Sequence, residues 1–162
     1  MIFILLIIGI SLITADQVIK YWAVNTLRPV NSMDFIKFGD FDFIGFRYAE
    51  NDGAAFSSFS GARYFLLILN VILISGLIFY VVRFCKKDKL ILISTTLIIA
   101  GGIGNIIDRA RLGYVIDYIE VRFFDFAIFN FADMCVVIGA CLFLLYAIIS
   151  DFKEKKAIKS DE

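Results

Sequence analysis

The 162-residue sequence contains no histidine. This absence excludes histidine as a general base, catalytic triads that need it, and metal sites with imidazole ligands. The net charge is zero, because 16 basic residues balance 16 acidic ones. A chain without excess positive charge is not expected to bind nucleic acid.

Cysteine is scarce. Cys85, Cys135 and Cys141 show no spacing typical of a metal site or of a disulfide framework. Cys135 and Cys141 fall in an apolar run, where we expect both to be small core residues. The sequence therefore predicts no metal and no cofactor.

Charged residues are few, at 20%, whereas 60% of the chain is hydrophobic and the mean hydropathy is +0.85. Soluble domains are usually about 45–50% apolar and about 25% charged. A soluble fold of this length would expose too much apolar surface, so the composition predicts an integral membrane protein. The length allows one domain, residues 1–162.

Four apolar segments each approach the roughly 20 residues that cross about 30 Å of hydrocarbon. They are residues 1–22, 64–82, 90–107 and 132–150. The first lacks a basic leader and a convincing cleavage site, so we predict a retained helix rather than a signal peptide. The fold class expected is an all-α membrane protein with four transmembrane helices.

Two basic segments predict the orientation of these helices. Residues 83–89 and the tail at 151–162 carry four basic residues each. Short basic loops stay on the cytoplasmic side, so we expect both termini in the cytoplasm and residues 23–63 and 108–131 outside.

Cys85 tests this orientation, because it lies within the first basic segment. In a variant that keeps only this cysteine, a membrane-impermeant thiol reagent should leave intact cells unlabelled and should label them after the membrane is permeabilised. Efficient labelling of intact cells would reverse the predicted topology.

The first outer segment contains local structure signals. Residues 33–48 have aromatic-rich runs separated by "GD", which favours a small β-hairpin with its apolar face on the lipid headgroups. Pro29 precedes it as a turn signal. Residues 51–61 then predict an Asn or Asp cap and one or two turns of amphipathic helix.

Polar residues near the predicted outer interface are candidates for function. Asp16 and Lys20 have the spacing and order of a helical ion pair. Asn105 and Asp108 share a helix face, and Arg109 points elsewhere. Glycines at 101, 102 and 104 thin this helix, so a neighbouring backbone can approach, and a hydrogen-bonded clamp between helices is the alternative to a functional role.

Two further acids lie in the second outer segment and at the start of the fourth span. Asn130 and Asp133 have the spacing of an N-cap and a first-turn acid, so capping alone would explain them. Asp117 lies among apolar residues without a local partner, and pairing with Arg109 or Arg111 is its structural alternative.

Several acids thus gather at one interface with neither histidine nor a metal motif. Two aspartates that share one proton can activate water and protonate a leaving amine. On this reasoning Asp108, Asp117 and Asp133 are all eligible.

Five motifs occur in order along the chain: "DQVIK" at 16–20, "NDGAAF" at 51–56, "GNIIDR" at 104–109, "VIDYI" at 115–119 and "FNFAD" at 129–133. With these motifs on four predicted spans, the chain resembles the lipoprotein signal peptidases (signal peptidase II), which are bacterial membrane aspartic peptidases. The resemblance runs over nearly the whole chain.

The resemblance implies a catalytic pair at Asp117 and Asp133. It also implies supporting or substrate-contacting roles for Asn51, Asn105, Asp108, Arg109, Asn130, Asp16 and Lys20. The implied substrates are prolipoproteins with a diacylglyceryl-modified cysteine, cut just before that cysteine. The implied setting is the bacterial cytoplasmic (inner) membrane, in contact with phospholipid, and we expect a monomer with its active site near the extracytoplasmic face.

Other classes of protein also use acids in membrane helices. A proton or ion pathway would place an acid near the bilayer midplane, where none of these apolar runs has one. A metal-dependent phosphatidyltransferase would need a DG-x2-AR core, which "DRAR" does not match. A presenilin-like protease would need GxGD, and "KFGD" lacks the first glycine.

Overall fold

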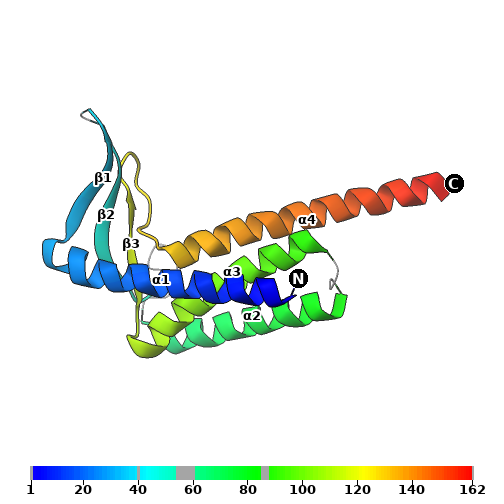
Figure 1. Ribbon diagram of the computed structural model, residues 1–162, viewed down its shortest axis with the longest axis horizontal. Coiled ribbons are helices and arrows are strands. Elements are labelled where there is room, and N and C mark those ends of the chain that lie inside the picture. The colour runs from blue at the N-terminus through cyan, green and yellow to red at the C-terminus, as the bar shows by residue number, and fades with distance from the viewer. Residues whose placement is uncertain (1, 40, 54–60, 85–87, 162) are drawn as a thin grey trace.

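The computed structural model describes residues 2–39, 41–53, 61–84 and 88–161. Four helices lie side by side, with a three-stranded sheet at one end (Figure 1). The helices are α1 (Ile2–Val30), α2 (Arg63–Phe84), α3 (Lys89–Arg111) and α4 (Phe131–Asp161). All four are long and apolar enough to cross a membrane. The predicted fold class, four such helices with a small β-element, is confirmed.

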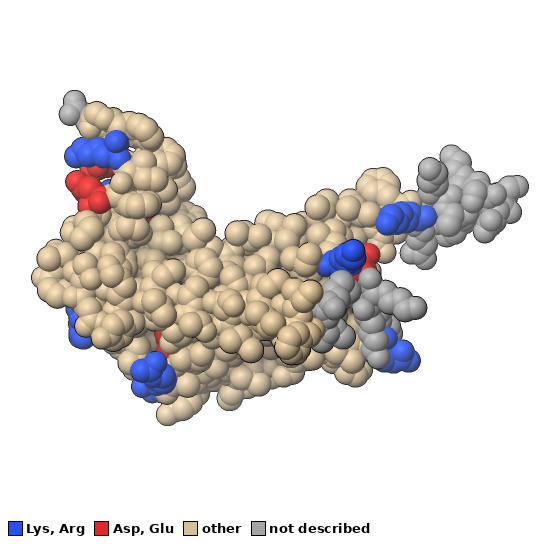
Figure 2. Space-filling view, viewed as in Figure 1, with Lys and Arg blue, Asp and Glu red and all other residues tan. Residues whose placement is uncertain are grey.

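As far as the structure describes it, each predicted apolar segment falls within one of these helices, and α1 and α4 continue well beyond theirs. The start of α1, the end of α2, the start of α3 and the end of α4 lie at the end away from the sheet (Figure 1). On the face that Figure 2 shows, charged side chains gather towards the two ends, and a broad uncharged band separates them. This distribution is typical of a bundle whose middle is immersed in hydrocarbon.

The central helix is α3. It contacts α1, α2 and α4, and 39% of its apolar window is buried, against 11–17% in the other three helices. Its glycines permit this closeness, as predicted. A Cβ added at Gly101 would collide with the carbonyl oxygen of Ala132 in α4, and one at Gly104 would lie 2.5 Å from a carboxylate oxygen of Asp16 in α1.

The sheet has the order β1-β2-β3, with antiparallel pairing throughout. Its strands are β1 (Ser32–Phe38), β2 (Phe41–Asn51) and β3 (Val115–Val121). The hairpin of β1 and β2 confirms the strands predicted over residues 33–48. The strand β3 was not predicted as one, because the sequence could not show that it pairs with β2, where Ala49 faces Asp117.

The junction from α1 to the sheet differs from the prediction. Pro29 lies in the last turn of α1 rather than in a turn. The turn comes at Asn31, whose φ is 66° and whose N–H donates to the carbonyl of Leu27 at 2.7 Å. Asparagine tolerates this left-handed conformation better than most residues, so it ends the helix here. Leu27 itself is buried against Ile116 and Tyr118 of β3, which explains why α1 extends beyond its predicted span.

Two predictions about cysteines have different outcomes. Cys135 is buried, as expected, but Cys141 is exposed. The two are six residues apart on α4, which turns them about 240° from each other around the helix axis, so both cannot face the core. Cys85 and most of the amphipathic helix predicted over 51–61 lie outside the described residues.

Candidate active site

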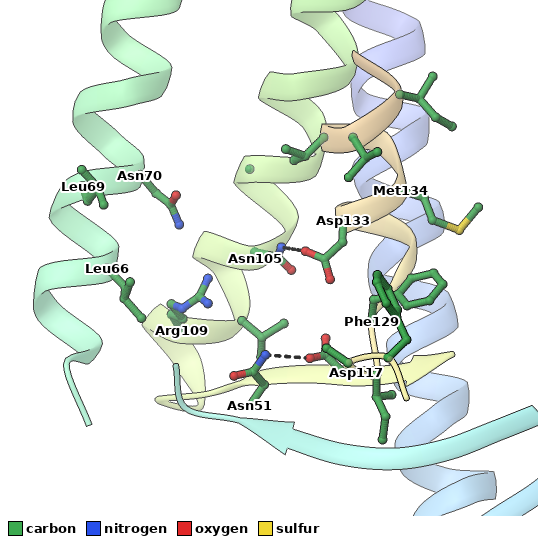
Figure 3. Close-up of a pocket in the computed structure, with 18 residues that line it drawn as sticks. Asn51, Leu66, Leu69, Asn70, Asn105, Arg109, Asp117, Phe129, Asp133 and Met134 are labelled. Atoms are coloured by element: carbon green, nitrogen blue, oxygen red, sulfur yellow. Dashed lines mark hydrogen bonds between the residues drawn. The ribbon is translucent and has the colours of Figure 1, made fainter. Parts of the chain in front are cut away.

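A cavity of about 620 Å³ opens between α2, α3 and α4 beneath the sheet. Asp117 from β3 and Asp133 from α4 both line it (Figure 3). Most of the remaining wall is apolar, and includes Leu66, Leu69, Phe129, Val136 and Val137. The two acids thus share one partly enclosed cavity with mostly apolar walls.

Asp133 lies in the first turn of α4, where it takes part in a reciprocal cap. Its N–H donates to the side-chain oxygen of Asn130 at 2.9 Å, and the N–H of Asn130 donates to its carboxylate at 3.2 Å. The capping prediction is confirmed. The other carboxylate oxygen accepts a hydrogen bond from the Asn105 amide at 2.7 Å, so the side chain is held while it faces the cavity.

Asp117 is 2% exposed, and two side-chain amides hold it. Asn51 at the end of β2 donates to one carboxylate oxygen at 2.9 Å, and Asn130 donates to the other at 2.6 Å. Burial raises the pKa of Asp117 to about 7, and the charge of Asp133 acts in the same direction, against the two amide hydrogen bonds. No ion pair joins this carboxylate to Arg109 or Arg111 within the described residues, so the alternative pairing is not supported.

A chain of amides connects the two acids. Asn130 donates to Asp117 and caps the helix that carries Asp133, and its amide also lies 3.2 Å from the side-chain oxygen of Asn105. Asn105 in turn bonds Asp133 and accepts a hydrogen bond from Lys20 at 3.0 Å. Each amide thus contacts at least two other site residues, which restrains the relative position of the carboxylates.

Lys20 is buried behind this network. Its ammonium group lies 3.0 Å from the carboxylate of Asp16 and 2.8 Å from that of Asp108, all three side chains being at most 3% exposed. The predicted Asp16–Lys20 ion pair is confirmed, and Asp108 extends it to a second helix. This is also the clamp between helices that the sequence left open.

The two acids of this cluster hold the backbone beside the two cavity acids. Asp108 accepts from the N–H of Ile116 at 3.2 Å, directly before Asp117. Asp16 accepts from the N–H of Ala132 at 3.1 Å, directly before Asp133. The cluster is therefore positioned to orient both cavity acids without lining the cavity itself.

Gln17 is a member of this cluster that sequence reasoning missed. Its amide lies 3.2 Å from Asp16, 3.1 Å from Asp108 and 3.3 Å from the carbonyl of Gly104. The only sequence signal was its place inside "DQVIK", next to an acid.

Arg109 points away from Asp108, as predicted, and lines the cavity. It is 7% exposed, and its guanidinium donates to the carbonyl of Gly53 at 2.6 Å. Its Nε atom has no hydrogen-bond partner within the described residues. This contact ties α3 to the chain just after β2, and the sequence did not indicate Gly53 as a partner.

The family described as signal peptidase (SPase) II matches residues 8–149. A lipoprotein signal peptidase of Streptococcus thermophilus (strain CNRZ 1066) is 41% identical over 136 residues, which are 84% of this chain and 86% of the relative. The lipoprotein signal peptidase of Clostridium tetani (strain Massachusetts / E88) is 38% identical over 160 residues, 97% of this chain and 98% of the relative.

A solved structure shares the fold. It is a bacterial membrane enzyme determined by the in meso method at 2.3 Å resolution, with a TM-score of 0.86 and 29% identity over 96% of this chain and 93% of that one. The sequence match and the structural match both extend over nearly the whole chain. This multi-pass bacterial membrane protein is therefore a peptidase that belongs to the signal peptidase II family, whose members remove signal peptides from lipoproteins.

Proposed function

We propose that this protein is an aspartic endopeptidase that cuts diacylglyceryl-modified prolipoproteins just before the lipidated cysteine. The observation that carries the proposal is that Asp117 and Asp133 line one cavity and are connected through Asn130. The cavity walls are mostly apolar, which suits a substrate whose signal helix and acyl chains lie in the bilayer.

The two acids would divide the chemistry between them. Asp133 carries the negative charge, because the N–H of Asn130 and the amide of Asn105 both donate to its carboxylate at the start of α4, where the helix dipole also favours an anion. Asp117 carries the proton, because it is buried and its pKa is raised to about 7. Asp133 takes a proton from water as that water attacks the scissile carbonyl, and Asp117 donates a hydrogen bond to the carbonyl oxygen. Asp133 then passes the proton it took from water to the leaving amine as the C–N bond breaks.

The membrane orientation predicted from the basic segments also suits the proposed reaction. With the basic segments in the cytoplasm, the sheet and the cavity lie at the extracytoplasmic face. Exposed aromatic side chains on the sheet, among them Phe35, Phe38 and Phe43, would then contact phospholipid headgroups. A prolipoprotein presents its modified cysteine at this interface, and we propose that one copy of the chain, as a monomer, suffices to cut it.

Cleavage by the purified protein tests this function. In detergent, it should convert a diacylglyceryl prolipoprotein to a smaller lipidated product, visible as a gel shift, and should leave the unlipidated precursor intact. A chelator should not change the rate, because we propose no metal. Equal cleavage of both precursors, or of neither, would contradict the proposal.

The rate should also depend on pH in a defined direction. Because the raised pKa of Asp117 keeps its proton up to about pH 7, kcat/KM should fall as the pH rises through that value. Below pH 7 Asp117 keeps its proton, so its titration should not lower the rate there. Measurement of kcat/KM from pH 5 to 9 in one detergent checks this, and a rate that increases from pH 7 to 9 would contradict a protonated Asp117.

A further inference from the structure

Asn70 is a polar residue in the middle of an apolar stretch of α2, and it lines the cavity. Figure 3 shows its amide pointing from α2 towards Arg109 and Asn105. Within the described part of the chain, no group forms a hydrogen bond with this amide. The mechanism above does not use it.

The depth of Asn70 follows from the contact between α2 and α3. A Cβ added at Gly102 would lie 2.7 Å from the Cδ1 atom of Ile74, so these two residues touch. The two helices run in opposite directions. Asn70 is one turn from Ile74 towards the sheet, and Asn105 is about one turn from Gly102 in the same direction. Asn70 is therefore level with Asn105, whose amide bonds Asp133.

This position places an unpaired amide across the cavity from the cleavage machinery. A polar side chain in an apolar site is unfavourable unless it finds a hydrogen-bond partner. Within membrane spans such residues often mark the path of a substrate. On the same wall, the buried Nε atom of Arg109 also lacks a partner among the described residues. Asn70 thus offers an unused donor to the cavity at the depth of the acids.

We propose that Asn70 donates a hydrogen bond to a carbonyl oxygen of the bound prolipoprotein close to the scissile bond, and so acts as a positioning residue. This inference rests on the proposed function. To expose its scissile bond, the signal helix must end inside the cavity, which leaves its last carbonyls without intrahelical donors. Most of the cavity wall is apolar and cannot donate, so a polar side chain such as that of Asn70 has to supply the donors. The ester carbonyls of the lipid present the same chemistry.

The test uses Asn70→Leu, which keeps the size of the side chain and removes its hydrogen-bonding groups. Loss of a hydrogen bond made in both the bound substrate and the transition state should raise KM about fivefold to tenfold and leave kcat nearly unchanged. Asn70→Gln keeps the donor and should recover part of the loss. Because leucine makes α2 more apolar, the variant should insert and fold normally. A melting temperature in detergent equal to that of the wild type will show that it is folded.

Asn25→Leu is the matched control, since the Asn25 amide donates to the carbonyl of Tyr21 within α1 and does not line the cavity. It should behave as the wild type. A precursor with an ether-linked lipid separates the two carbonyl sources. An equal KM increase with ester and ether precursors assigns the bond to a peptide carbonyl, and an increase confined to the ester precursor assigns it to the lipid.

Two negative results have different meanings. If the wild type cleaves the lipidated precursor and Asn70→Leu has the same KM for both precursors, this inference is wrong and the proposed function stands. If the wild type does not cleave the lipidated precursor, the proposed function is wrong, and the role of Asn70 falls with it.

Discussion

Replacement of Asp117 or Asp133 by asparagine is expected to lower the rate of prolipoprotein cleavage by about a thousandfold or more, because each acid moves or holds a proton that asparagine cannot. Asparagine has nearly the same shape and keeps part of the hydrogen bonding to Asn51, Asn105 and Asn130. Both variants should therefore insert and bind the lipidated precursor. The rate is measured with the same gel-shift assay as for the wild type.

The double variant is the sharper test of a pair. Two residues that act as a unit lose their whole effect when either is removed, so the double variant should be no slower than each single one. Asp151→Asn is the matched control, because this exposed acid lies far along α4 and pairs with Lys155. Substantial turnover by either single variant, properly inserted, would exclude the pair and would make Asp108 the next candidate.

Replacement of Lys20 by methionine is expected to lower the free energy of unfolding by about 3–5 kcal/mol, the usual range when one partner of a buried ion pair is removed. Lys20 is 1% exposed and is the cation shared by Asp16 and Asp108. Without it, two buried carboxylates face each other with only amide donors. Methionine fills a similar volume, so the loss reflects charge rather than a cavity. Thermal unfolding in one detergent measures the change.

A compensating variant distinguishes charge from packing. With Asp16→Asn and Asp108→Asn added to Lys20→Met, the buried charges are gone and much of the stability should return. Lys155→Met removes an equally short ion pair on the surface of α4 and should leave the unfolding temperature unchanged, because exposed pairs contribute little. A Lys20→Met protein as stable as the wild type would mean that the buried cluster does not hold the fold together.

Features that depend on residues close together in the sequence were predicted correctly. The four helices follow from apolar runs. In hydrocarbon, where water is absent, the backbone N–H and C=O groups must bond one another, and a helix achieves this within one segment. The hairpin of β1 and β2, the Asp16–Lys20 pair and the cap formed by Asn130 all depend on neighbours within a few residues. The glycines of α3 indicated a close helix contact without naming the partner, and Ala132 and Asp16 proved to be the groups that approach them.

Some local signals misled because tertiary contacts overrode them. Pro29 indicated a turn, yet α1 continues past it while Leu27 is buried against β3, and the chain turns at Asn31. Cys141 lies in an apolar run like Cys135, but it faces away from the core. In a membrane protein, apolar sequence does not distinguish a side chain that meets lipid from one that meets another helix.

Membrane residence, the four helices and, through the motifs, the family could all be predicted from the amino-acid sequence. How the polar residues combine depends on tertiary contacts. Pairing of β2 with β3 brings Asn51 to Asp117, although 66 residues separate them. Packing of α1 against α3 brings Lys20 to Asp108, and the capped start of α4 brings Asp133 to the same cavity. These contacts join segments far apart in the chain, and their geometry depends on the whole bundle closing around α3, which no single stretch of sequence encodes.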